Sequence, residues 1–462
     1  MSFTTPVFLI FLPVVLLLYW LLPAKMRWMM LLAASLLFYA WHNVWLLSLI
    51  LTTILVSYLC ARFIEEAETP AGKRKAMTFC AFVCLGILVI FKYLDFLTGS
   101  AVSLANFFGA DISFSGFGIL LPMGISFYVF QTMSYVLDVY RGTVKAEHHL
   151  GHYALFVAFF PQLVAGPIER PGDLLPQLKQ PRPFRKDYLP EGIPLLLRGY
   201  GKKLLIADFL AIWVDNAYAD VEKSGGLSLL IATVFFAFQI YCDFSGYCDI
   251  AQGCARLMGI RLKDNFRIPY AATSIRDFWH RWHISLTQWF TDYLYIPLGG
   301  SRKGQLRTCV NILLTFFVSG LWHGARWNYV LWGCIHGLYL CFERFVLKKK
   351  SPGPILTFLL VCFAWIFFRS ASIADAFTVL TRMVTAPLAT GLGIPLGELF
   401  LSIALIAFLP FLEKLPHLSS RQSPQRQTMV GFLYCFLLFA ILLCRFWVLS
   451  QYGETAFLYF QF

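Results

Sequence analysis

The sequence predicts an all-α, polytopic membrane protein, and three properties of the chain support that class. Of its 462 residues, 58% are hydrophobic and only 14% are charged, whereas about 25% are charged in an ordinary soluble domain. The mean hydropathy is +0.66. Apolar runs of about 18 residues recur along the chain, each long enough to cross ~30 Å of hydrocarbon as a helix. A soluble enzyme, a secreted scaffold and a disordered chain are therefore excluded.

About 11–12 transmembrane helices are expected, drawn approximately at 5–22, 29–42, 44–61, 77–96, 117–137, 152–165, 226–243, 308–323, 327–346, 354–369, 396–412 and 428–449. Proline and glycine interrupt two of these runs, at Leu121–Gly124 and at Phe160–Pro167. Irregular backbone at membrane depth is tolerated only where protein or a water-filled cavity satisfies its polar groups. We therefore expect re-entrant and interfacial helices around a central tunnel. The first run lacks a basic leader and a cleavage site, so we expect it to be retained.

The positive charge of the chain indicates its orientation in the bilayer. The formal charge is +13, but the basic residues lie in short loops between apolar runs, as at 73–75 and 348–350. This is the positive-inside pattern, so no nucleic acid is expected as a partner. Lys25 and Arg27 follow the first run and predict an N-terminus outside the cytoplasm.

The loop before the last span predicts the position of the other terminus. This loop carries Lys414, Arg421 and Arg426, so we expect it to be cytoplasmic and the C-terminus to be extracytoplasmic. The mixed basic and apolar stretch 181–218 is consistent with an amphipathic element on the cytoplasmic interface or with an ordinary loop containing one short helix. No long linker or fixed-period repeat is found, so residues 1–462 are expected to form a single transmembrane domain.

Cysteine and histidine usage argues against a metal site. The twelve cysteines lie mainly inside apolar runs without a CxxC pair, which is typical of small buried residues. A membrane metal oxygenase would need many paired histidine boxes, whereas this chain has nine histidines in total. We therefore expect no metal.

The most polar segment is 241–303, where ionisable residues are concentrated in an otherwise apolar chain. Such groups at membrane depth are costly unless they are paired or hydrated, so the segment indicates a cavity or an interface. Within 274–285, helical spacing places Asp277 against Arg281. Two interpretations remain open: an interfacial amphipathic helix with internal ion pairs, or a wall of the active cavity.

His323 ends an apolar run in the segment Val318–Asn328 and is the strongest candidate for a functional group. A lone histidine within the membrane indicates function more often than one in a soluble core. His336 follows thirteen residues later and faces another side of a continuous helix, so it need not share the same site.

The motifs between residues 120 and 340 resemble the bacterial branch of the membrane-bound O-acyltransferase (MBOAT) family, near the membrane subunits of alginate and peptidoglycan O-acetylation. The matching stretches are Leu121–Tyr128, Gly166–Pro171, Tyr241–Gly246, Asn265–Tyr270, Asp277–Ser285, Tyr295–Arg302 and Ser319–Gly324. The resemblance implies that 120–340 is a catalytic core, that His323 is catalytic, and that His283 lies in the same cavity. We expect the remaining cavity residues to be Asp277, Arg281, Trp282, Trp322, Asn328 and His336.

The tail 450–462 ends Ala456–Phe462, which resembles the terminal aromatic motif of several cell-wall acylation systems. The resemblance implies that Tyr459 carries the acyl group. An aromatic anchor at the membrane interface is the alternative interpretation. Ten residues of extended chain could reach about 33 Å, enough for Tyr459 to fold back into a tunnel.

These features predict an O-acetyltransferase at the bacterial cytoplasmic membrane that acts on an exported or cell-wall polysaccharide. Acetyl-CoA would be the donor, and a neutral His323 would deprotonate a hydroxyl or attack directly as a nucleophile. The chain has no Gly-x-Ser-x-Gly elbow, and the resemblance implies an extracytoplasmic SGNH-type partner that reaches the polysaccharide. A transporter with broken helices and buried charges but no covalent step is the main alternative. A pure scaffold would not require the polar segment 265–303.

Overall fold

The computed structural model describes residues 1–41, 43–180, 182–348, 350–386, 391–419, 436–437 and 441. Across these residues the chain forms helices and irregular segments and contains no strand, which confirms the all-α prediction. The chain divides into two compact units. One comprises residues 1–185 together with 258–262, and the other comprises 186–257 and the chain from 263 onward.

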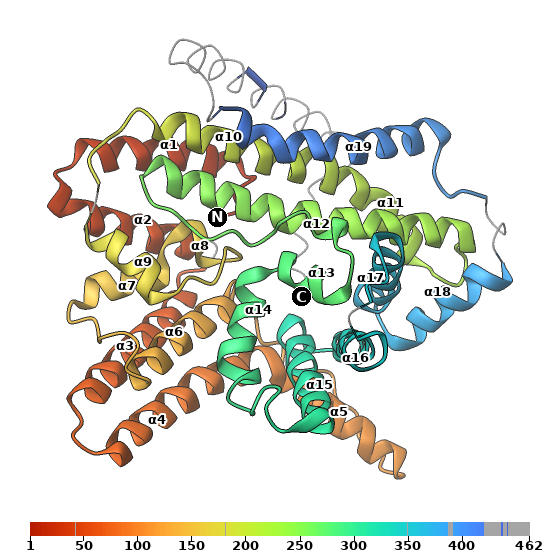
Figure 1. The fold of residues 1–462 in the computed structure, drawn as a ribbon, viewed down its shortest axis with the longest axis horizontal. Helices are drawn as coiled ribbons and strands as arrows, with labels where there is room; N and C mark the ends of the chain where they lie inside the picture. The colour runs from red at the N-terminus through yellow and green to blue at the C-terminus, as the bar shows by residue number, and fades with distance from the viewer. Residues whose placement is uncertain are drawn as a thin grey trace. The chain divides into compact units, whose positions relative to one another are not determined.

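The N-terminal unit is a set of apolar helices in which α3 packs against α4 and α6 (Figure 1). Its α-helices are α1 (Pro6–Leu21), α2 (Arg27–Ala40), α3 (Leu46–Glu66), α4 (Pro70–Leu88), α5 (Leu94–Phe107), α6 (Ile125–Tyr140), α7 (Leu150–Ala158), α8 (Phe160–Leu163) and α9 (Pro171–Lys179). Short 3-10 and π segments, η1 (Ala24–Met26) and η2 (Val89–Tyr93), join some of them.

The helix interruptions predicted from proline and glycine are present in this unit. Helix α7 ends at Ala158 and the four-residue α8 follows, while α6 begins only after Gly124. Gly124 adopts φ +71°, and a Cβ there would lie 2.8 Å from the Leu163 carbonyl oxygen. Glycine is therefore required at this turn, both for its conformation and for the close approach of the two interrupted segments.

The second unit is built around the long helix α12 (Gly226–Leu257), drawn in green in Figure 1, along which α10 and α11 pack. Its other α-helices are α10 (Tyr188–Tyr200), α11 (Asp208–Ala219), α13 (Ile275–Arg281), α14 (Ile284–Phe290), α15 (Gly304–His323), α16 (Trp327–Phe342), α17 (Pro354–Arg369), α18 (Ile373–Thr385) and α19 (Leu396–Ser419). The connecting 3-10 and π segments are η3 (Gly201–Ala207), η4 (Pro269–Ala271), η5 (Thr291–Tyr295) and η6 (Glu343–Leu347).

Six helical segments of the described chain are long and apolar enough to cross a bilayer, and the protein is a multi-pass membrane protein. They are Leu46–Glu66, Pro70–Phe107, Gly226–Leu257, Gly304–His323, Trp327–Leu347 and Leu396–Pro416. Two shorter apolar helices, α1 and α17, coincide with the predicted runs 5–22 and 354–369. The run predicted at 428–449 lies almost wholly outside the described residues.

Two basic residues in the middle of the stretch 181–218 are buried, which differs from the expected amphipathic surface, whereas Arg182, Arg185 and Lys186 near its start are exposed. Lys202 and Lys203 are each 1% exposed. Lys202 Nζ lies 2.9 Å from Asp249 Oδ2 and 2.7 Å from Glu413 Oε1, and Lys203 Nζ lies 2.8 Å from Asp208 Oδ1. Charges are tolerated in an interior only when they are paired in this way. This stretch therefore fastens α10 and η3 to α12 and α19.

Candidate functional site

Helices α15 and α16 form a closely packed hairpin that places the histidine predicted to be catalytic. Gly320 of α15 lies directly against the backbone of Tyr329, and Gly333 of α16 lies directly against the backbone of Phe316. A side chain at either glycine would collide with the partner helix. Small residues of this kind allow two helices to approach closely in a membrane protein. His323 is the last residue of α15, at the turn between the two helices.

The ring of His323 lies in an aromatic enclosure and is 6% exposed. Its centroid is 5.0 Å from that of Trp332 and 5.6 Å from that of Phe368. The Trp322 ring is 5.1 Å away. These rings surround the imidazole and shield it from water.

His283 lies beside His323, with ring centroids 6.4 Å apart. It is fully buried and has a left-handed backbone, with φ +44°. This conformation is uncommon outside glycine. It separates α13 from α14 and turns the His283 ring inward, where Phe244 of α12 contacts it at 4.7 Å.

Asn265 holds the other edge of the His283 ring. Its Oδ1 lies 3.3 Å from His283 Nδ1, and it also accepts from the Ser285 N–H and Ser285 Oγ at 3.1 and 2.9 Å. Burial lowers the pKa of His283 well below its usual value, and the neighbouring His323 lowers it further. His283 is therefore neutral at physiological pH.

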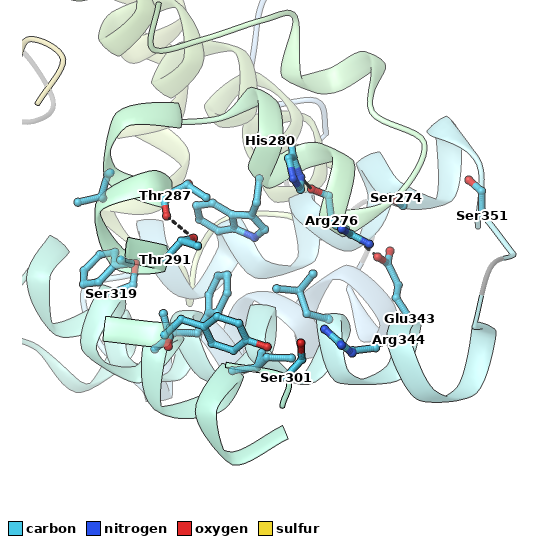
Figure 2. Close-up of a pocket in the computed structure, with 18 of the residues that line it drawn as sticks. Ser274, Arg276, His280, Thr287, Thr291, Ser301, Ser319, Glu343, Arg344 and Ser351 are labelled. Atoms are coloured by element: carbon cyan, nitrogen blue, oxygen red, sulfur yellow. Dashed lines mark hydrogen bonds between the residues drawn. The ribbon is translucent and has the colours of Figure 1, made fainter. Parts of the chain in front are cut away.

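A cavity of about 830 Å³, within the size range of small-molecule sites, lies among α13, α14, α15 and α16, and neither His283 nor His323 is among the residues that line it. Its wall includes Ile312, Thr315, Phe316 and Ser319, which form one face of α15. Ser319 is one helical turn before His323, so the cavity extends along α15 toward the catalytic candidate. Figure 2 shows Ser319, Thr287 and Thr291 at one end of the cavity.

The opposite end of the cavity is basic. Figure 2 places Arg276, Glu343 and Arg344 there, and Lys348 and Lys350 also line the cavity. Glu343 caps the start of α13 by accepting the backbone N–H groups of Ile275 and Arg276 at 2.5 and 3.1 Å. The cations therefore outnumber the carboxylate at this end, which favours an anionic ligand.

Three of the predicted cavity residues are buried aromatic rings near the histidine pair. Trp322 lies 5.8 Å from the His283 ring. Trp282 stacks on Phe278 and supports the loop carrying His283. His336 accepts from Trp279 Nε1 through its Nδ1 at 3.3 Å. His336 contacts the Trp332 ring, which separates it from His323.

The other three predicted cavity residues lie apart from the histidine pair. Asp277 and Arg281 form the expected i,i+4 pair at 2.8 Å and are about one-third exposed. Burial alone would raise the pKa of Asp277, but the hydrogen bonds from Arg281 and the Thr273 N–H outweigh it and lower the pKa. Asn328 donates to the carbonyls of Ser370 and Phe367 at 2.8 and 3.3 Å, tying α16 to the end of α17. Tyr459 lies outside the described residues.

Sequence reasoning missed several groups of the site. Asn265 belongs to a quoted motif, yet nothing in its spacing indicated a contact with a histidine 18 residues later. Trp332 and Trp365, which stack at 5.7 Å, and Phe368 complete the aromatic enclosure. Tryptophan and phenylalanine are so common in this chain that their pattern carried no signal. Within the described ranges, no three His, Cys, Asp or Glu side chains are grouped to hold a metal ion.

Comparison with known proteins gives a consistent result. The model of the membrane-bound O-acyltransferase family matches residues 144–368. A probable alginate O-acetylase of Azotobacter vinelandii is 41% identical over 83% of this chain and 78% of its own length. A peptidoglycan O-acetyltransferase of Helicobacter pylori is 34% identical, covering 83% and 79%. A teichoic acid D-alanyltransferase of Bacillus subtilis is 27% identical, covering 53% and 68%.

Proposed function

The chain belongs to the membrane-bound O-acyltransferase family and is an acyltransferase, and from that premise we propose that it transfers acetyl groups from cytoplasmic acetyl-CoA toward an exported or cell-wall polysaccharide. The names of the alginate and peptidoglycan relatives support an acetyl group and a polysaccharide acceptor. The protein works in the bacterial cytoplasmic membrane as a single catalytic domain. Residues 120–340 are its core.

The proposal rests on a pair of buried histidines, one of which, His323, lies one helical turn beyond the wall of a cavity with a basic end. His283 and His323 have ring centroids 6.4 Å apart, and the cavity wall reaches Ser319. A neutral His323 in a dry aromatic enclosure is suited to general-base catalysis. Trp322 and Trp282 shape the enclosure, Asn328 and His336 brace it, and the Asp277–Arg281 pair stabilises α13.

The charge of the loops supports a donor that arrives from the cytoplasm. Helices α15 and α16 are antiparallel, so the start of α15 and the end of α16 lie on the same side of the hairpin. Both ends are basic, with Arg302, Lys303 and Arg307 before or within α15 and Arg344 and Lys348 after α16. The positive-inside rule makes this side cytoplasmic. The phosphates of acetyl-CoA would face these cations, with the thioester directed along α15 toward His323.

The chemical step balances with the groups present. His323 removes the proton from an acceptor hydroxyl while the hydroxyl oxygen attacks the thioester carbonyl. The C–S bond then breaks, and the CoA sulfur leaves with the proton that His323 returns, giving an ester and free CoA. General-base assistance of this kind contributes roughly 10²–10⁴-fold to rate.

Tyr459 in the tail 450–462 is the proposed first acceptor. A phenol with a pKa near 10 is easier to deprotonate than an alkyl alcohol, and its ester is more activated for onward transfer. The next acceptor is an extracytoplasmic SGNH-type partner, which esterifies the polysaccharide. The protein itself needs no metal in this scheme.

Mass spectrometry of the C-terminal peptide tests the proposal. Purified protein in detergent is incubated with acetyl-CoA, beside His323→Ala and Tyr459→Phe variants. Acetylation of Tyr459 in the wild type alone is the expected result. If acetyl-CoA turnover depends on His323 but the peptide stays unmodified, Tyr459 does not carry the acetyl group. The acetyl group then passes directly to a partner or sugar. If turnover and peptide modification are both independent of His323, the transferase proposal is refuted and a transporter is favoured.

A further inference from the structure

We infer that Asn265 is a positioning residue that fixes His283 in a single tautomer, with the proton on Nδ1 and Nε2 left as a hydrogen-bond acceptor at the histidine pair. The inference rests on the proposed function and assigns His283 one chemical role within it: it accepts a hydrogen bond and does not donate one through Nε2. This assignment follows from the donors around one amide oxygen.

The orientation of the Asn265 amide is fixed by a donor that cannot be reversed. The backbone N–H of Ser285 lies 3.1 Å from one terminal atom of the Asn265 side chain. An N–H group can only donate, so that atom must be the amide oxygen. The other terminal atom is then the NH₂ group, which lies 3.5 Å from Cys248 Sγ, a weak acceptor.

The tautomer of His283 follows from that orientation. Its Nδ1 lies 3.3 Å from the same Asn265 oxygen. Because an amide oxygen can only accept, Nδ1 must carry the hydrogen. A neutral imidazole has one N–H, so Nε2 on the opposite edge of the ring bears a lone pair.

The surroundings keep both the amide and the ring in place. Asn265 is 1% exposed, and its backbone carbonyl accepts the Ile284 N–H at 3.0 Å, so the residue is held through its backbone as well as its side chain. The left-handed backbone of His283 sets the direction of the ring. Three donors converge on one oxygen, which makes rotation of the Asn265 amide costly.

The neighbours of His283 contribute little charge among the described residues. His323 of α15 is the titratable group whose charge acts on it. Cys248 of α12 contacts the Asn265 amide. Phe244 of α12, Phe266 and Trp322 of α15 complete the ring contacts, and none of them titrates. The Asn265 amide is therefore an uncharged partner for His283 Nδ1. A carboxylate at the same position would favour the protonated, cationic form of His283.

This arrangement divides the work between the two histidines. An acceptor at Nε2 of His283 can hold the hydrogen of an incoming hydroxyl, or the N–H of His323, while His323 takes up the reacting proton. Protonated His283 could do neither, because Nε2 would become a donor. Activity should therefore disappear on the acid side when His283 is protonated.

The Asn265→Asp variant tests the inference in the full-length protein. A carboxylate accepts the same three hydrogen bonds but adds a negative charge next to Nδ1, which raises the pKa of His283 by about 1–3 units. The acid limb of the pH profile for CoA release from acetyl-CoA should move upward by a comparable amount. The matched control is Ser285→Ala, which removes one donor to Asn265 but leaves the Ser285 N–H that fixes the amide, so its acid limb should stay at the wild-type pH.

Asn265→Leu removes the acceptor that holds the His283 Nδ1 hydrogen, and it should lower CoA release at least tenfold. Asn265→Asp should be active at high pH, which distinguishes a positioning role of this side chain from a packing role. Thermal melting of each variant checks that it is folded. The inference is overturned if folded Asn265→Asp keeps the wild-type acid limb, or if Ser285→Ala shifts the limb equally. Failure of the wild type to release CoA would instead refute the proposed function, so the two failures are distinguishable.

Discussion

The imidazole of His283 is completely buried, and burial favours its neutral form over the cation. The motif resemblance predicted that His283 and His323 share a cavity, and their rings lie 6.4 Å apart. The tautomer could not be predicted in the same way. It depends on Asn265, which the fold brings to Nδ1 through a left-handed residue that sequence spacing does not reveal.

Acidification is expected to destabilise the protein through His283. Because its folded-state pKa is lowered below the unfolded value of about 6.5, the unfolded chain binds a proton below that pH that the folded chain does not. The free energy of unfolding should therefore fall as the pH drops below about 6.5, by at most about 1.4 kcal/mol per pH unit.

Thermal melting in detergent between pH 7 and pH 5 measures this effect. The melting temperature of the wild type should fall more steeply with acidification than that of His283→Gln, which cannot take up the proton. Identical slopes for the two proteins would mean that His283 is not held neutral by the fold.

At the scale of single helices, the local hydropathy pattern predicted most of the helices. Ion pairs between residues far apart in the sequence determine where others end. The predicted run 226–243 ends where the first carboxylate appears, yet α12 continues to Leu257. It continues because Lys203 pairs with Asp243 and because Arg198 and Lys202 pair with Asp249. These cations come from α10 and η3, some 40 or more residues earlier, so a local hydropathy pattern could not include them.

The buried pairing of α12 with α10 and η3 should be indispensable for stability. Asp249→Asn leaves Arg198 and Lys202 short of a carboxylate in a buried setting, and breaking a buried pair costs about 3–5 kcal/mol. A large loss of melting temperature is expected. Lys223→Ala is the control, because its pair with Asp220 is exposed and should be dispensable. An equally small effect from both substitutions would show that the buried pairs are not needed to hold these helices.

The close approach of α15 and α16 should be needed for activity as well as for stability. Gly333→Ala places a methyl group against the Phe316 carbonyl and should push the two helices apart about two helical turns before His323. We expect acetyl-CoA turnover to fall at least tenfold with a lower melting temperature. Gly86→Ala in α4 meets no atom within 4 Å and should be neutral or slightly stabilising. Full activity in Gly333→Ala would contradict this role of the hairpin.

For the whole molecule, composition was sufficient to predict a multi-pass helical membrane protein, because apolar runs of spanning length admit few alternatives. The family was also predictable, since motifs across 120–340 retain their order and the family model matches 144–368. The cavity was not predictable in detail. Its wall combines α13, α14, α15, α16 and the segment after α16, and only the fold brings the Ser319 end and the basic end into one space.

If His323 transfers acetyl groups from acetyl-CoA, the purified protein should give a burst of CoA release. Purified protein without any partner is mixed with acetyl-CoA, and free CoA is quantified by chromatography, which avoids interference from the protein's twelve cysteines. The wild type should release about one equivalent of CoA per protein as its own acceptor is loaded, and His323→Ala should release at least 10²-fold more slowly. An absent burst in the wild type, or an equal burst in His323→Ala, would show that His323 does not catalyse acetyl transfer from acetyl-CoA.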